Sequence, residues 1–310
     1  MGYLSRSLDV QVGLPTPPAG SPAQARMPLT RTGLAVARSG RLHDRPDRIG
    51  QLAVQCLHLE VDTYPKPGLV SHIDSGSHQD MGAALMRRSA DVLAPFLTEL
   101  AAAGACGASL DRLRAIGIAA ECAMLDATGG VNTHRGAIFG MGLLAAAAGF
   151  RSRFAIPGSL GRIVARCWGP SILRSAIASA SHGAQAARLY GVGGARAEAA
   201  AGFPSLYDIA VPALVAGEGL APYDPESVRV HGCMALIAAV DDTNLLHRGG
   251  LDGLIFAQRA AAAFLNAGSI AQPDWKERAV EMHGEFIARK LSPGGCADLL
   301  SMALFVRALE

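Results

Sequence analysis

Apolar residues recur at every third or fourth position along most of the chain from about residue 45 onward. The first stripe contains Ile49, Ala53, Cys56 and Leu57, the spacing of one face of an amphipathic helix. Strict alternation of apolar and polar residues, the pattern of a half-buried strand, is nearly absent. The sequence therefore predicts an all-α protein, with a single compact multi-helix domain over residues 45–310.

Turn-forming residues divide this pattern into separate helices. The first helix ends at Tyr64–Gly68, because the prolines and glycine of that segment cannot continue it. Ser77 is followed by Asp80 in a near capping box, which predicts a second helix to about Ala103 with a kink at Pro95. Further helices are expected at residues 110–128, 137–148, 158–180 with an interruption at 169–170, 208–215, 225–240, 251–266, 274–290 and 296–308, and a glycine-punctuated linker is expected at 190–204.

Residues 1–44 differ in composition, with a proline-rich run and dispersed arginines. Such a segment cannot offset its ordering entropy by burial, so we predict a disordered basic leader. Residues 1–50 hold seven arginines against three aspartates, which leaves the remainder slightly acidic although the whole chain carries a net charge of +2. A slightly acidic body argues against nucleic acid as a partner.

Half of the residues are apolar, 17% are charged and 5% are aromatic, which is typical of closely packed, alanine-rich helices. The six cysteines show no CxxC spacing, and this favours a reducing compartment over disulfides or a zinc site. The longest uncharged run, residues 136–150, is shorter than the roughly 20 residues that span a bilayer. The N-terminus has no signal-peptide pattern, so we expect a cytoplasmic protein with no membrane partner.

A polar loop, Gly129–Gly136, joins two of the predicted helices. Its leading glycines permit a tight turn with positive φ, and the residues behind them precede a helix N-terminus, where free N–H groups attract anions. An ordinary pair of helix caps would explain the glycines and one polar residue, but it has no use for His134 and Arg135. We therefore predict a phosphate- or nucleotide-binding loop. Its binding residues are Gly130, Asn132, Thr133, Arg135 and Gly136.

Glu60, Asp62 and Lys66 form a second cluster at the proline-stiffened turn. Lys66 is the only lysine before position 276. A lysine in a rigid turn favours a point-charge contact with phosphate, although a solvated loop lysine explains the pattern equally well. His78 and Asp80 form a third cluster, which would be a helix cap with an exposed histidine if it stood alone.

The fourth cluster is the acidic pair Asp241 and Asp242, followed by His247 and Arg248. Adjacent acids at a helix end repel each other, so such a pair is more often retained for a cation than for stability. Oxygen-rich ligands suit Mg²⁺ shared with phosphates. We predict that both aspartates bind Mg²⁺, with Asp80 as a further ligand; the alternative is a solvated turn.

Together the four clusters describe a site for a nucleoside triphosphate with Mg²⁺. Lys66, Arg135 and Arg248 are predicted to hold the triphosphate, with His247 beside them. Neither a Walker motif nor a strand–GxGxxG–helix unit is present. ATP would therefore bind without a standard phosphate loop.

Seven segments carry long or unusual motifs. They are Glu60–Val70, Gly76–Met81, Gly130–Phe139, Gly194–Arg196, Gly202–Pro204, Asp241–Gly249 and Ser292–Leu300. These segments resemble the signatures of the triphosphoribosyl-dephospho-CoA synthase family, and the last four look like its malonate decarboxylase branch. Where many members have acidic residues, this chain has Ser71 and Gly82, so any metal-binding role of those acids lies elsewhere here.

The resemblance implies an all-α transferase that condenses ATP with 3′-dephospho-CoA. The ribose 2′-hydroxyl of dephospho-CoA attacks C1′ of the ATP ribose, and adenine leaves while the triphosphate stays on the sugar. The product is the precursor of the prosthetic group of the malonate decarboxylase acyl-carrier subunit. It would be passed to a holo-carrier-protein synthase.

This displacement needs a base for the hydroxyl, a proton donor for adenine and a carboxylate near the developing positive charge. The catalytic candidates are Glu60, Asp62, His78 and His134. Glu60 and Asp62 would point about 200° apart on a helix, so only one of them faces the site. We choose Asp62 as the base because it lies nearer the rigid turn, and His134 as the donor.

Two other classes of function are open. A helical metal-dependent nucleotide or ADP-ribose hydrolase would use similar acids and anion loops, with water as the nucleophile, and would release free ribose triphosphate. In a non-catalytic helical scaffold the polar clusters would be only caps and loops. Binding of ATP with Mg²⁺ separates this last class from the two enzymes.

Overall fold

The computed structural model describes residues 45–175, 185–186 and 189–310, and every regular element in these ranges is a helix. The predicted all-α class is therefore confirmed. All of these residues belong to one compact unit. The predicted leader, residues 1–44, and the last part of the helix predicted at 158–180 lie outside the described residues, so the leader and the domain boundary stay predictions.

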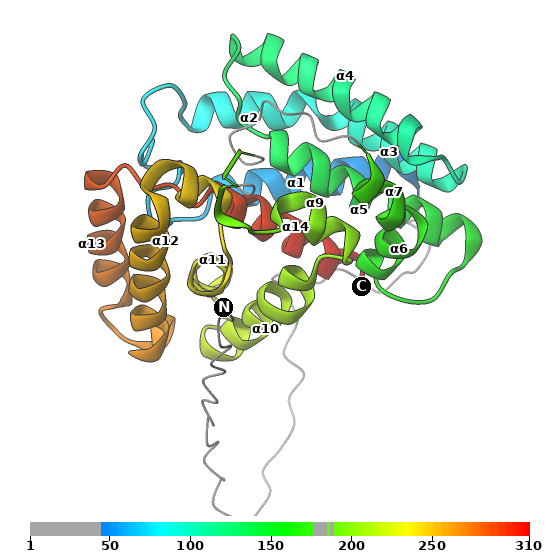
Figure 1. Cartoon of the computed structure of the whole chain (residues 1–310). Coiled ribbons are helices and arrows are strands. Elements are labelled where there is room, and N and C mark those ends of the chain that lie inside the picture. The colour runs from blue at the N-terminus through cyan, green and yellow to red at the C-terminus, as the bar shows by residue number, and fades with distance from the viewer. Residues whose placement is uncertain (1–44, 176–184, 187–188) are drawn as a thin grey trace, which may run out of the picture. The chain divides into compact units, whose positions relative to one another are not determined.

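The helices are labelled in Figure 1. Their bounds are α1 Pro46–Val61, α2 Ala83–Val92, α3 Ala94–Ala105, α4 Leu110–Thr128, α5 Arg135–Phe154, α6 Leu160–Cys167, α7 Gly169–Arg174, α9 Gly194–Ala200, η1 Ser205–Ala210, α10 Val211–Leu220, α11 Pro225–Ala239, α12 Thr243–Asn266, η2 Ser269–Ala271, α13 Trp275–Ala288 and α14 Gly294–Leu309. The short elements η1 and η2 are a π-helix and a 3₁₀-helix.

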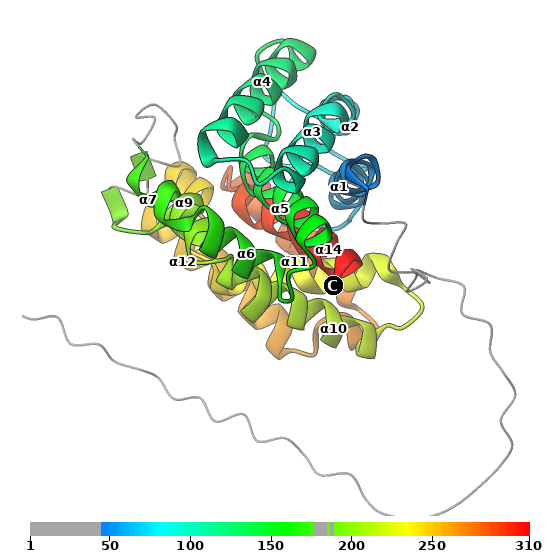
Figure 2. The same cartoon turned by 90° about the vertical axis from the view of Figure 1, so that its right-hand side faces the viewer.

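Helix α5 is buried along most of its length, from Ala137 to Gly149, and it contacts α3, α4, α6 and α14. Glycines allow the closest of these contacts, because a Cβ added at Gly104 or Gly149 would overlap a backbone carbonyl of the facing helix. In Figure 1 and Figure 2, α5 and α14 lie between α2–α4 on one side and α10–α12 on the other. The N-terminal ends of α5 and α14 are thereby brought into the packed interior, where polar groups on different helices can meet.

One predicted feature of the second helix is wrong, and another is present. Ser77 does not cap it: α2 begins at Ala83, and the Ser77 hydroxyl instead donates to the backbone oxygen of Leu291 over 2.6 Å. A tertiary acceptor has replaced the local capping interaction. The interruption predicted at Pro95 is present: α2 ends at Val92 and α3 begins at Ala94, with Pro95 in its first turn, and only Leu93 separates the two helices.

Three predicted boundaries also change. The predicted linker at 190–204 contains α9, because its alanines favour a helix between the flanking glycines. Helix α12 begins at Thr243, where Asp242 caps it, and the sequence did not predict this first part. Gly250, with φ 62°, interrupts the helical geometry, so the helix predicted from about residue 251 is the second part of α12. The segment predicted as a short helix at 208–215 is also longer, since η1 and α10 together span Ser205–Leu220.

Within the described ranges, no single helix is long and apolar enough to cross a membrane. Helix α9 and the segment Ser205–Leu220 reach the required length and composition only as a pair, and an 82° bend separates them.

Candidate active site

Three helix N-termini, those of α5, α12 and α14, are joined by two aspartates. Asp242 is the N-cap of α12: its Oδ1 accepts hydrogen bonds from the backbone of Asn244 over 2.7 Å and of Leu245 over 3.3 Å. Its Oδ2 accepts a third from Cys296 N, in the first turn of α14, over 2.8 Å. Asp242 is 2% exposed. One carboxylate therefore ties two helix ends together.

Asp298, near the start of α14, makes the corresponding link to α5. Its carboxylate accepts a hydrogen bond from the backbone N–H of Ala137. A Cβ at Gly136 would overlap Asp298 Oδ2, so only glycine leaves room for this approach. Gly136, predicted as a nucleotide-binding residue, therefore has a packing role in this structure.

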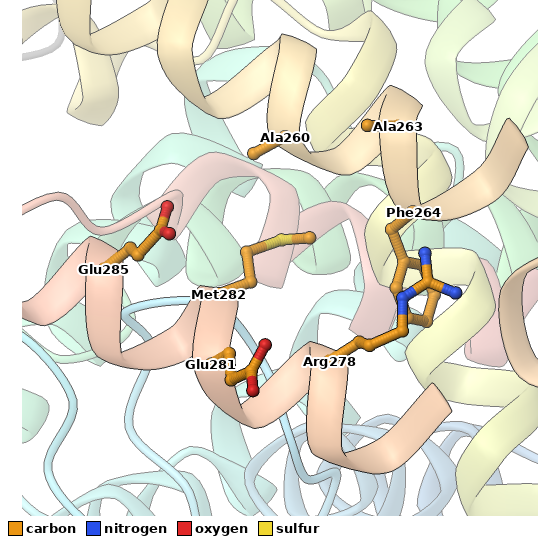
Figure 3. Close-up of a pocket in the computed structure, with 7 residues that line it drawn as sticks. All are labelled: Ala260, Ala263, Phe264, Arg278, Glu281, Met282 and Glu285. Atoms are coloured by element: carbon orange, nitrogen blue, oxygen red, sulfur yellow. The ribbon is translucent and has the colours of Figure 1, made fainter. Parts of the chain in front are cut away.

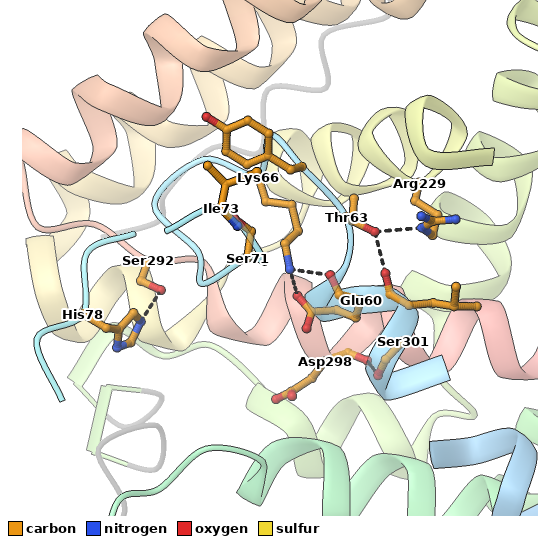
Figure 4. Close-up of polar contacts among 12 residues, drawn as sticks. Glu60, Thr63, Lys66, Ser71, Ile73, His78, Arg229, Ser292, Asp298 and Ser301 are labelled. Carbon is orange, nitrogen blue, oxygen red and sulfur yellow. Dashed lines mark hydrogen bonds and ion pairs between the residues drawn. The ribbon is translucent and has the colours of Figure 1, made fainter. Parts of the chain in front are cut away.

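Glu60 and Lys66 form a buried ion pair at the end of α1, shown in Figure 4. Lys66 is completely buried, and its Nζ donates both to the Glu60 carboxylate and to the Glu60 backbone oxygen, the latter over 2.5 Å. The loop that carries Lys66 is anchored by His283, whose Nδ1 lies 2.7 Å from Lys66 O and whose Nε2 lies 3.0 Å from Asp74 Oδ1. In this conformation Lys66 has no exposed surface to offer a triphosphate.

Asp62 and Thr63 lie just after α1. The Asp62 carboxylate forms an ion pair with Arg87 of α2, and 43% of the Asp62 side chain is exposed. Thr63 Oγ1 accepts from Arg229 Nε over 2.8 Å and donates to Leu59 O over 2.7 Å. Glu60 and Asp62 are thus separated as predicted, one buried and the other open to solvent.

His134 is the N-cap residue of α5 and is 3% exposed. Its Nδ1 lies 2.8 Å from the Ser89 hydroxyl, which in turn lies 2.6 Å from Thr133 Oγ1. Burial, with smaller contributions from His58 and Lys66, lowers the His134 pKa to about 4. Nε2 is buried without a hydrogen-bond partner. At neutral pH His134 is therefore uncharged and can donate a hydrogen bond, but it has no additional proton to transfer.

The predicted anion loop has the expected backbone but a different set of contacts. Gly129 and Gly130 have positive φ, 65° and 90°. Arg135 forms an ion pair with Glu121 of α4, and its backbone N–H donates to Asn132 Oδ1 over 3.2 Å. Together with the Asp298 contact at Ala137, these bonds occupy part of the first turn of α5. A phosphate at this helix end would therefore depend mainly on side chains.

His78 and Arg248 meet at a more exposed position. His78 Nε2 lies 2.9 Å from Ser292 Oγ, and Arg248 Nη2 lies 3.2 Å from His78 Nδ1. Arg248 also donates to the backbone oxygens of Ser77 and Lys290, over 3.4 and 3.3 Å. Burial and then the Arg248 charge lower the His78 pKa. The structure thus places His78 and Arg248 together, with the exposed His247 one residue before Arg248.

The predicted magnesium ligands do not form a common group. Asp80 and Asp241 are exposed, and Asp241 Oδ1 accepts from Gln258 Nε2 over 3.3 Å. Both oxygens of Asp242 already accept backbone hydrogen bonds. Across the described part of the chain, no group of three or more His, Cys, Asp or Glu side chains is arranged to hold a metal ion. These residues therefore do not fit a resident magnesium site.

Sequence reasoning missed Asp298, Ser89 and the pair of Asp74 and His283. Asp298 lies inside the last of the unusual motifs, so a signal was present, but its neighbours in sequence do not indicate which helix end it would face. Ser89 and His283 lie within helices, where a polar residue is ordinarily a surface position. Only their tertiary contacts distinguish them.

A separate cleft of about 230 Å³ lies between α12 and α13 (Figure 3). Its lining is Ala260, Ala263, Phe264, Arg278, Glu281, Met282 and Glu285. The Arg278 guanidinium lies 5.7 Å from the centre of the Phe264 ring. The cleft shares no residue with the polar cluster, and we assign it no part in the chemistry.

The polar cluster is assembled inside an all-α domain from residues of several distant segments, which is the arrangement expected of a candidate active site in a helical enzyme. The chain belongs to the ATP:dephospho-CoA triphosphoribosyl transferase family, whose model matches residues 46–310. This confirms the family and the transferase class predicted from the motifs.

Several relatives share most of their length with this chain. The probable 2-(5″-triphosphoribosyl)-3′-dephosphocoenzyme-A synthase of Stutzerimonas stutzeri (strain A1501) is 40% identical over 270 residues, which cover 85% of this chain and 92% of that protein. The 2-(5″-triphosphoribosyl)-3′-dephosphocoenzyme-A synthase of Pectobacterium atrosepticum is 40% identical over 268 residues, which cover 82% of this chain and 86% of that protein. Neither name specifies the malonate decarboxylase branch, which stays a prediction. No solved structure gives a significant match.

Proposed function

We propose that this protein transfers the 5-triphosphoribosyl group of ATP to the ribose 2′-hydroxyl of 3′-dephospho-CoA and releases adenine. The observation that carries the proposal is the meeting of three motif segments in one polar cluster. Glu60 and Lys66 come from the first segment, His134 and Gly136 from another, and Asp298 from the last. Family membership gives this cluster its chemistry, and relatives of similar length carry the corresponding name.

The charges of the cluster suit a displacement at C1′ of a ribose. A carboxylate near the anomeric carbon stabilises the positive charge that develops there, and Glu60 is an acid held in place by its ion pair with Lys66. In this proposal Lys66 orients Glu60. The triphosphate is held by Arg135 and Arg248, which retain surface exposure, with His247 at the same rim.

Asp62 is proposed as the base that takes the proton of the 2′-hydroxyl. Because Asp62 and Glu60 point apart, the reacting riboses would have to lie across the end of α1, with Glu60 beside C1′ on one side and Asp62 beside the hydroxyl on the other. Its carboxylate is partly exposed, and the ion pair with Arg87 fixes its direction. A single displacement inverts C1′ and needs no covalent nucleophile. Asp62→Asn should therefore abolish turnover and leave ATP affinity nearly intact. Substantial remaining kcat, or a ribosyl adduct trapped on the enzyme, would refute this role.

His134 is proposed as a neutral hydrogen-bond donor through Nε2. With Nδ1 bonded to Ser89, the other ring nitrogen is free to carry hydrogen and to contact a phosphate or the adenine. The low pKa of His134, about 4, means that it makes this contact as a neutral ring.

Magnesium is proposed as a companion of the substrate. The triphosphate of ATP ordinarily carries Mg²⁺ with several of its waters, and such an ion needs few protein ligands. The exposed carboxylates Asp80 and Asp241 are the candidates that remain accessible to it. A titration of activity with Mg²⁺ in the presence of ATP tests this proposal, and activity that persists in excess chelator would refute it.

The function is tested by incubating the protein with ATP and 3′-dephospho-CoA. Mass spectrometry should detect free adenine and an adduct that retains the triphosphate. Release of ribose triphosphate without an adduct would favour the nucleotide hydrolase instead. Absence of any reaction, together with no binding of ATP and Mg²⁺, would favour a scaffold.

We also propose that the product is passed to a holo-carrier-protein synthase for the malonate decarboxylase acyl-carrier subunit. The support is the form of four motifs, including Asp241–Gly249 and Ser292–Leu300. A strain lacking this gene should lose growth on malonate and regain it on complementation. Loss of growth on citrate alone would assign the protein to the other branch.

A further inference from the structure

Asp298 is the acidic residue of the cluster that the proposed function leaves without a role. The other acids have firm partners: Glu60 is paired with Lys66, and Asp62 with Arg87. Asp242 accepts three backbone hydrogen bonds as a double helix cap. Asp298, by contrast, is partly exposed, and the described contacts of its carboxylate are the Ala137 N–H and the close approach to Gly136.

The position of Asp298 is built by specific features of the fold. Its own backbone oxygen accepts a hydrogen bond from Ser301 Oγ over 2.8 Å, which helps to hold this part of α14. The absence of a side chain at Gly136 allows the carboxylate to approach α5. In Figure 4 the side chains of Glu60 and Asp298 extend toward the same side of the cluster. A substrate beside the Glu60 carboxylate would therefore also face Asp298.

The surrounding charges favour a protonated Asp298. Loss of solvent around the carboxyl group, followed by the negative charges of Glu60 and Asp242, raises the Asp298 pKa well above its usual range, and the Ala137 N–H opposes this only in part. The groups that face it are Glu60 near the end of α1, which is itself paired with Lys66, Asp242 at the start of α12 and Cys296 on α14. The Cys296 thiol itself has a pKa raised well above the usual value, so it is uncharged.

Departure of adenine requires a proton that His134 cannot supply as a neutral ring. The bond from C1′ to N9 breaks and its electron pair moves into the adenine ring, so protonation of a ring nitrogen lowers the barrier. Enzymes that break a glycosidic bond with acid assistance place two groups beside the sugar: a protonated acid and a separately held carboxylate. In this cluster Glu60 supplies the ion-paired carboxylate and Asp298 the second carboxyl group.

We propose that Asp298 is the general acid that protonates the departing adenine. This role rests on the proposed transfer reaction. As the new bond forms between the dephospho-CoA 2′-oxygen and C1′, the Asp298 proton passes to adenine and the hydroxyl proton passes to the base. Asp298 is left as a carboxylate and regains a proton from solvent after the products leave. The reaction consumes no net proton and needs no further reactant.

The test compares Asp298→Asn on two substrates, ATP and N7-methylated ATP. The methylated base already carries a positive charge and leaves as a neutral base without protonation. With ATP, the variant should lose roughly 10²–10⁴-fold in kcat, the usual contribution of a general acid. With N7-methylated ATP, its kcat should stay within about ten-fold of the parent's, since no acid is needed. Asp111→Asn, an exposed aspartate of α4, is the matched control and should match the parent on both substrates.

The pH profile of the parent gives a second readout that a structural role would not produce. With ATP, kcat should fall at alkaline pH as the acid loses its proton, and this limb should be absent with N7-methylated ATP. Equal loss on both substrates by a folded Asp298→Asn variant would overturn the proposal, and so would full activity of that variant on ATP. Asparagine can still accept the Ala137 N–H, and thermal melting verifies the fold.

Gly136→Ala tests the geometry without removing the carboxyl group. The new Cβ would overlap Asp298 Oδ2 and displace the carboxyl from its position. Turnover of ATP should fall by about ten-fold or more while N7-methylated ATP remains a good substrate. Unchanged turnover of ATP would count against the assigned position. If the parent itself forms no adduct, the proposed function fails; if the parent is active and both variants are normal, only the role of Asp298 fails.

Discussion

Replacing Lys66 by methionine separates a structural role for this lysine from the predicted contact with triphosphate. Lys66 is completely buried and Glu60 is 6% exposed, so the substitution leaves a carboxylate buried without its counter-charge. Breaking a buried ion pair in this way costs roughly 3–5 kcal/mol. For a domain of this size, each kcal/mol corresponds to about 2–4 °C in Tm. Lys66→Met should therefore lower the Tm by roughly 6–20 °C.

Thermal melting followed by circular dichroism measures this shift, and ATP kinetics are measured on the same preparations. Lys276→Met, at an exposed lysine of α13, is the matched control and should melt with the parent. The double variant Glu60→Leu with Lys66→Met removes both charges and should recover most of the lost stability, since an apolar pair can replace a buried ion pair at little cost. It should remain inactive, because Glu60 is then missing from the site.

The opposite outcome is equally clear. If Lys66→Met melts with the parent and raises the KM for ATP by ten-fold or more, the lysine leaves Glu60 to bind the triphosphate. A loss of charge-assisted phosphate contact of about 1.5–3 kcal/mol corresponds to that increase in KM. The buried pair would then describe only the protein without ATP.

Three further predictions follow from the contacts of the cluster. Asp242→Ala removes the caps of both α12 and α14, and because each lost cap costs roughly 0.5–2 kcal/mol, it should lower the free energy of unfolding by about 1–4 kcal/mol. Normal stability with an altered Mg²⁺ titration of activity would instead support the predicted metal role. Arg135→Ala should raise the KM for ATP about ten-fold, and an increase confined to dephospho-CoA would assign Arg135 to that substrate. The pKa of His134 is about 4 in the folded protein against the usual 6.5, so on acidification the unfolded chain binds this proton first. The free energy of unfolding should therefore fall between pH 6.5 and pH 4, by up to about 3 kcal/mol. His134→Gln should flatten this fall, and an unchanged pH dependence in the variant would contradict the assignment.

Local sequence patterns were sufficient to predict most of the helices and the turn at Gly129 and Gly130. Periodic apolar positions identified most helices, and Asp224, directly before Pro225, caps α11 through its side chain. Gly129 and Gly130 adopt the positive φ expected of them. These features depend on neighbours within one or two helical turns, which a single sequence displays directly.

The motifs also identified the family and marked the segments that would form the site. The roles of individual residues could not be predicted from the sequence as well as the family could. Lys66 reads in sequence as a loop lysine, yet it is fully buried against Glu60. Asp242 reads as half of a metal-binding pair, yet it caps α12 and α14 at once. In both cases the partner that decides the role comes from the packing of the chain.

Asp298 shows the same limit most clearly. The sequence by itself determined that the chain folds into helices and that an acid lies near the start of the last one. Only the tertiary structure decided that this acid faces the N-terminus of α5, at a glycine that leaves it room. The reason is physical: helix formation follows local periodicity and capping, whereas the charge and solvation of a carboxyl group depend on every segment packed around it. Those segments are distant in sequence and become neighbours only when α5 and α14 pack together.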